Sequence, residues 1–64
     1  MKVSEMNKQD LLDLMRGNGE LLRPASESQA WQRAFILARA NGLEDVDLGC
    51  AKCYQKVREW LERV

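Results

Sequence analysis

The sequence predicts an all-α protein, a compact three-helix bundle with helices over about residues 7–16, 27–40 and 48–63. Apolar residues recur with a helical period inside each of these segments. Stretches rich in glycine, asparagine and proline separate them. No segment alternates apolar and polar residues as a half-buried strand does, and β-branched residues are scarce. We expect one domain, residues 1–64, with residues 1–4 frayed.

The first predicted helix begins near Ser4 or Asn7, because either short polar side chain can accept a free backbone N–H of the first turn. Its apolar face consists of Leu11, Leu12, Leu14 and Met15. The Gly-Asn-Gly segment at 17–19 ends the helix, since these residues tolerate the left-handed conformation of a C-terminal cap. We expect both Leu21 and Leu22 to enter the core after it.

The second predicted helix begins with the capping-box pattern of Ser26 and Gln29 and ends at Asn41-Gly42. Its apolar stripe consists of Trp31, Ala34, Phe35 and Ala38, with Ala30 and Leu37 beside it. Ile36 does not belong to this stripe: at 100° per residue it lies roughly 140° from Trp31, on the polar face. Ile36 is therefore our candidate for a contact with a partner.

The third predicted helix follows Asp47, its expected N-cap. Its apolar residues lie within an arc of roughly 120° that excludes every charged residue. These residues are Cys50, Cys53, Tyr54, Val57, Trp60, Leu61 and Val64. The helix is therefore expected to pack this seam, both cysteines included, into the core.

The Cys50-x-x-Cys53 pair has three interpretations. Two cysteines one helical turn apart can pack as small apolar residues, which the seam favours. A thiol redox centre is also consistent with a helix N-terminus and a nearby Lys52, although Asp47 opposes a thiolate and the usual strand before such a motif is missing. A structural zinc site needs four ligands, so it would require two such pairs across a dimer. We predict no bound metal or cofactor.

Composition narrows the remaining classes of function. Ten basic and ten acidic residues cancel, which argues against nucleic-acid binding, because such proteins depend on a basic excess. Residues 38–42 have the Ala-x-x-x-Gly spacing of a helix-turn-helix motif, but the expected connection after them is too long. Glu44, Asp45 and Asp47 would also lie where contacts with phosphate and bases require cations. The chain contains no histidine, the commonest general base and a common metal ligand.

These observations predict a non-enzymatic interaction or accessory module that binds an unidentified protein partner or self-associates. A domain of 64 residues has a small core, which association would help to stabilise. The alternatives are a zinc- or thiol-dependent protein that uses Cys50 and Cys53, and a small DNA-binding domain. No apolar run reaches the ~20 residues that span a bilayer. The N-terminal residues lack the apolar core of a signal peptide, so we expect a cytoplasmic location.

Overall fold

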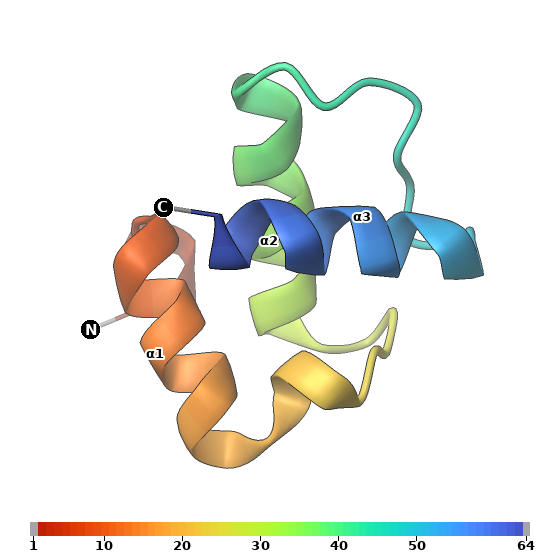
Figure 1. The fold of residues 1–64 in the computed structure, drawn as a ribbon. Coiled ribbons are helices and arrows are strands. Elements are labelled where there is room, and N and C mark those ends of the chain that lie inside the picture. The colour runs from red at the N-terminus through yellow and green to blue at the C-terminus, as the bar shows by residue number, and fades with distance from the viewer. Residues whose placement is uncertain (1, 64) are drawn as a thin grey trace.

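The computed structural model describes residues 2–63, which form three α-helices and two single-turn 3-10 helices, with no strand in this range. In chain order they are η1 (Val3–Glu5), α1 (Lys8–Asn18), η2 (Glu20–Leu22), α2 (Gln29–Ala40) and α3 (Ala51–Glu62). All three α-helices contact one another. Figure 1 shows α2 passing through the middle of the molecule, with α3 crossing it and α1 at one side. The predicted all-α, three-helix fold is confirmed.

Helix α1 is bounded by the two caps that its sequence predicts. The side chain of Asn7 accepts a hydrogen bond of 2.9 Å from the backbone N–H of Asp10. At the other end Gly19 has φ of 78°, a left-handed conformation that favours glycine, and the helix extends to Asn18 rather than 16. Met1 lies outside the described residues, and Val3, within η1, packs partly buried against the core. Fraying of the first residues stays a prediction.

The prediction that Leu21 and Leu22 both enter the core is wrong for Leu22. Leu21 is buried, whereas Leu22 is 74% exposed. The segment forms η2, a 3-10 turn, in which successive side chains point about 120° apart. One of two adjacent leucines therefore faces the core and the other faces away from it.

Helix α2 begins later than predicted, and its cap is Ser28 instead of Ser26. The Ser28 hydroxyl accepts from the backbone N–H of Trp31 at 3.3 Å. The same hydroxyl donates to Oε1 of Glu20 at 2.7 Å. A turn in which the N–H of Ser28 bonds to the carbonyl of Ala25 occupies the place of the expected first helical turn. The contact between Ser28 and Glu20 of η2 thus favours Ser28 as the cap, and the local capping-box pattern gives no information about this contact.

The core is centred on Trp31, which is completely buried. Its ring makes edge-to-face contacts with Phe35, at a centroid distance of 6.4 Å, and with Tyr54 of α3, at 5.2 Å. Its indole N–H donates to the carbonyl of Glu20 at 2.9 Å, which ties η2 to α2. Such aromatic pairs add about 0.5–1.5 kcal/mol each beyond the area they bury. The other large, fully buried side chains are Phe35, Leu11, Met15, Val57 and Leu61.

Helix α3 begins at Ala51 rather than 48, because Asp47 does not cap it. The Asp47 side chain instead accepts from the N–H of Gly49 at 2.6 Å, a local turn typical of aspartate. The N–H of Cys50 bonds to the carbonyl of Asp47 at 3.2 Å and closes the same turn. The connection from α2 is consequently longer still than the turn of a helix-turn-helix motif.

Removing the indole N–H of Trp31 tests the central position of this residue. We expect Trp31→Phe to lower the free energy of unfolding by about 0.5–1.5 kcal/mol more than Trp60→Phe does, because the carbonyl of Glu20 loses this hydrogen bond and keeps only the one from the N–H of Arg23. Trp60 is also largely buried, but its indole makes no hydrogen bond within residues 2–63. Urea unfolding followed by circular dichroism measures both variants. Equal losses would contradict the assigned role of this hydrogen bond.

Candidate functional site

The first candidate site surrounds Ile36, whose side chain is 54% exposed on α2, as its position on the helical wheel predicts. It borders a groove of about 560 Å³ between η1 and α2. The residues that line this groove are Lys2, Val3, Ser4, Gln29, Gln32, Arg33 and Ile36. The groove therefore has an apolar residue on each wall, Val3 and Ile36, together with two amide side chains and the positive charges of Lys2 and Arg33.

Arg33 fixes the N-terminal wall of this groove. Its Nε donates to the carbonyl of Met6 at 3.1 Å, which holds the segment after η1 against α2. Val3 and Met6 also pack, partly buried, against the core. Among the described residues that line the groove, none is acidic. The groove is thus a positively charged, partly apolar surface with a defined wall.

The sequence interpretation found Ile36 but missed the rest of this groove. Gln29, Gln32 and Ile36 follow a helical i, i+3, i+7 spacing, so a shared face was visible in the sequence. The opposite wall was not visible, because fraying is expected for residues 1–4. In addition, nothing in the sequence around Arg33 indicates that its side chain binds the main-chain carbonyl of Met6. That Ile36 contacts a partner stays a prediction.

A second hollow of about 370 Å³ lies between α1 and α3, and Lys8, one of the cations that line it, already binds groups of the protein itself. Nζ of Lys8 donates to the carbonyl of Arg63 at 2.8 Å. The same ammonium lies 4.5 Å from the ring centroid of Trp60, within the range of a cation–π contact. Lys8 therefore joins the two ends of the chain, and this hollow offers a ligand less than the groove does.

The second candidate site is the cysteine pair, and the structure places its two thiols differently. Cys53 is 3% exposed, as the predicted seam requires. Cys50 is only half-buried, because it is the N-cap residue of α3 with an extended backbone. The N–H of Cys53 bonds to the carbonyl of Cys50 at 3.0 Å, so the two residues close one turn. Cys50 thus departs from the fully buried position expected for it.

The connection between α2 and α3 holds the cysteine pair in place. Nε of Arg39 donates to the carbonyl of buried Val46 at 3.1 Å. The hydroxyl of Tyr54 donates to the carbonyl of Leu48. The thiol of Cys53 lies 3.6 Å from the carbonyl oxygen of Asp45, its acceptor, and Asp45 adopts a left-handed φ of 60°, which aspartate tolerates better than most residues.

The surroundings of the two thiols shift their pKa values in opposite directions. A hydrogen bond from the Cys53 thiol lowers the pKa of Cys50 most, and the backbone N–H groups of Cys53 and Lys52 lower it further. The negative charge of Asp47 opposes this effect, as the sequence predicts. The interaction with Cys50 raises the pKa of Cys53, and burial adds to it.

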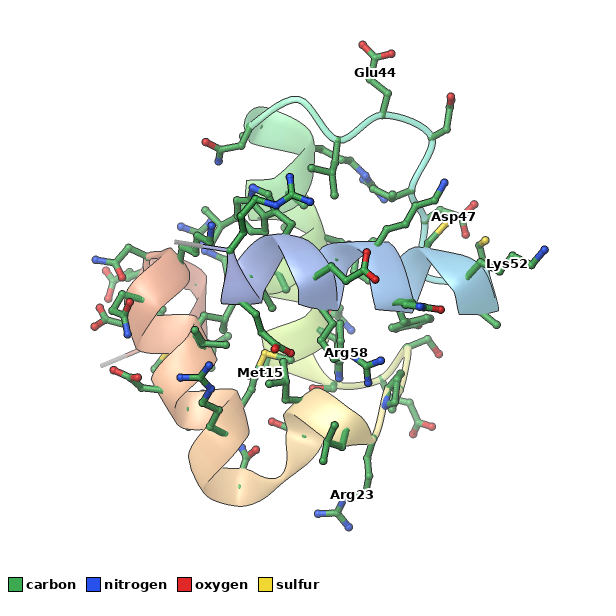
Figure 2. All side chains as sticks on the ribbon, viewed as in Figure 1. Met15, Arg23, Glu44, Asp47, Lys52 and Arg58 are labelled. Carbon is green, nitrogen blue, oxygen red and sulfur yellow. The ribbon has the colours of Figure 1, made fainter. Side chains whose placement is uncertain are left out.

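Lys52 contributes through its main chain and not through its charge. Figure 2 shows the Lys52 side chain projecting outward from the first turn of α3, while Asp47 lies in the connection just before the helix. It is the backbone of Lys52 that lowers the pKa of Cys50. The sequence interpretation had expected the charge of Lys52 to act.

The structure does not gather a metal site within one chain. Among residues 2–63, no three side chains of histidine, cysteine, aspartate or glutamate lie close enough to hold a metal ion together. Glu44, for example, projects away from the body of the molecule (Figure 2). A zinc ion shared between two chains stays a prediction.

Comparison with known proteins adds no assignment: no protein-family model, curated protein or solved structure matches this chain. None of the helices in the described part of the chain combines the length and apolar character required to cross a bilayer. The groove and the cysteine pair must therefore be interpreted from their own chemistry.

The phenol of Tyr54 gives a pH-dependent test of the packing beside the cysteines. Burial, with a smaller contribution from the charge of Asp47, raises the pKa of Tyr54 above its ordinary value of 10.0. The unfolded chain then loses this proton at lower pH than the folded protein does. The stability contribution is therefore complete below the ordinary pKa and is lost as the pH rises from there through the raised pKa of the folded protein.

Ultraviolet titration reads this phenol alone, because the chain has one tyrosine. We expect a midpoint above 10.0 in the folded protein, and a Tyr54→Phe variant whose stability falls less steeply in alkali. An ordinary midpoint, or an unchanged alkaline slope in the variant, would show that the phenol is not held as described.

Proposed function

We propose that this protein is a non-enzymatic interaction module that binds an acidic, amphipathic segment of a partner protein in the groove between η1 and α2. The observation that carries the proposal is the exposure of Ile36 on a wall of that groove. Isolated exposed apolar residues are ordinary on protein surfaces. An exposed isoleucine that borders a groove with a second apolar wall is a better candidate for a contact.

The chemistry of the groove determines the kind of segment it would accept. Ile36 and Val3 would bury apolar side chains, at about 1.5–3 kcal/mol for a fully buried residue. Lys2 and Arg33 favour carboxylates, and no acidic residue among those that line the groove offsets them. The amides of Gln29 and Gln32 can both donate and accept hydrogen bonds. An amphipathic segment with one apolar and one acidic face fits all three properties.

Because the domain is small, binding of a partner would add substantially to its stability. A core of this size often supplies no more than roughly 3–5 kcal/mol of stability. A partner that binds only the folded state adds to that margin by mass action, by about 2.7 kcal/mol at a hundred times its dissociation constant. We also propose a cytoplasmic location, which the two free cysteines support, since thiols there are kept reduced.

A second copy of the chain is the other protein that could bind in the groove, and the positive charges of Lys2 and Arg33 disfavour this dimer. In a two-fold symmetric dimer, the same patch faces itself on both subunits. Pairing the groove in this way would bring Lys2 and Arg33 of each copy toward the same cations of the other. An acidic partner has no such cost.

Peptide display on the immobilised protein tests the proposal without a known partner. We expect selected peptides to be enriched in aspartate or glutamate together with leucine, isoleucine or phenylalanine. Binding of a selected peptide should shift the amide resonances of Gln29, Gln32 and Ile36, and should weaken as salt screens the charges. Peptides without acidic enrichment, or shifts confined to other surfaces, would overturn the proposal.

Two substitutions to lysine supply a matched pair. Ile36→Lys should weaken peptide binding by about ten- to a hundredfold, because it removes an apolar contact worth about 1.5–3 kcal/mol. Leu22→Lys changes an even more exposed apolar residue that does not line the groove, and should leave the affinity unchanged. Sedimentation equilibrium should show a monomer, and a dimer that Ile36→Lys dissociates would favour the second copy instead.

A further inference from the structure

The two cysteines differ in the properties that separate an attacking thiol from a resolving one. Cys50 is half-buried and is the N-cap residue of a twelve-residue helix, where backbone N–H groups have no helical partner. Cys53 is almost completely buried one turn later. An attacking thiol must be accessible to another molecule, whereas a resolving thiol needs only to reach its neighbour.

We propose that Cys50 and Cys53 form a dithiol–disulfide exchange centre, in which Cys50 attacks a disulfide and Cys53 resolves the product. The substrate class is an accessible disulfide, either of a small thiol such as glutathione or of another protein. This activity goes beyond the interaction function and uses none of the residues of the groove.

The reaction is two successive exchanges. In the first, the thiolate of Cys50 attacks one sulfur of the substrate disulfide, a mixed disulfide forms, and the other substrate sulfur leaves as a thiolate that takes a proton from solvent. In the second, Cys53 loses its proton to solvent and attacks the Cys50 sulfur, which releases the remaining substrate thiolate. The protein loses two electrons and two protons, and the substrate gains them as two thiols.

The surroundings of Cys50 favour the thiolate that the first step needs. The neighbouring Cys53 thiol lowers the pKa of Cys50 most, followed by the backbone of Cys53 and Lys52. In the reduced pair, the Cys53 thiol donates to the carbonyl of Asp45, 3.6 Å from its sulfur. An ionised Cys50 is the stronger acceptor, because charge-assisted hydrogen bonds are about twice as strong as neutral ones.

The turn geometry suits the second step. The hydrogen bond of 3.0 Å between the Cys53 N–H and the Cys50 carbonyl closes a turn. Such a turn keeps its end Cα atoms within about 7 Å, and disulfides join Cα atoms about 4.4–6.8 Å apart. The two sulfurs can therefore bond without unfolding α3.

Trapping the intermediate tests the two roles. With oxidised glutathione, the parent protein should form an internal disulfide, seen by mass spectrometry as the loss of two hydrogens. Cys53→Ser should stop at a glutathione adduct on Cys50, whereas Cys50→Ser should form no adduct, because its remaining thiol is buried. Adducts on Cys53 of Cys50→Ser, or no reaction of the parent protein, would overturn the proposal.

Iodoacetamide labelling of the reduced, folded protein tests the thiolate directly. Cys50 should react faster than Cys53, because its sulfur is accessible and its pKa is lowered, with a midpoint below the ordinary 9.0. Asp47→Asn keeps an acceptor for the Gly49 N–H and removes the opposing charge, so it should lower that midpoint further. Equal rates at the two cysteines would overturn the proposal, as would zinc found by elemental analysis at one ion per two chains.

Discussion

The fold depends on the complete burial of one indole, that of Trp31, with its N–H satisfied. The ring contacts Tyr54 on α3 and Phe35 on its own helix, and the N–H bonds to the carbonyl of Glu20 in η2. A buried indole donor without an acceptor would be costly in a domain with so small a core. The chain around residue 20 therefore has to turn back onto α2. This requirement explains why Ser28 caps that helix, since its hydroxyl also bonds to the Glu20 carboxylate.

Each candidate site combines α-helical residues with a segment outside the α-helices, and a side chain of α2 fixes each of these segments. Arg33 holds the segment after η1 through the carbonyl of Met6, which forms a wall of the groove. Arg39 holds the connection before α3 through the carbonyl of Val46, which positions the residues that precede Cys50. Helix α2 thus contributes its apolar stripe to the core and its arginines to the two sites. Because the sites share no residue, binding in the groove does not require the cysteines to be reduced.

The sequence predicted what depends on local periodicity and missed what depends on contacts between distant residues. The three helices, the Asn7 cap and the exposure of Ile36 all follow from neighbours a few positions apart. The exposure of Leu22 and the half-exposure of Cys50 do not, because a 3-10 turn forms in the linker that contains Leu22 and an aspartate turn replaces the first helical turn expected at Cys50. The helical wheel places both cysteines on one seam. Because α3 starts later than expected, Cys50 packs against the core only partly buried, and the two thiols have different surroundings.

Five of the hydrogen bonds that join separate segments share a feature: a side chain donates and a main-chain carbonyl accepts. This holds for Lys8, Trp31, Arg33, Arg39 and Tyr54. Every residue has a main-chain carbonyl, so substitution of Met6 or Val46 leaves the acceptor of the bond in place. Substitution of a donor residue, in contrast, removes the donating side chain. Pairwise covariation would therefore be blind to these contacts, since only one member of each pair is under selection for it. The long-range architecture is recorded in single retained positions, and aligned relatives would reveal it as isolated invariant arginines and aromatics.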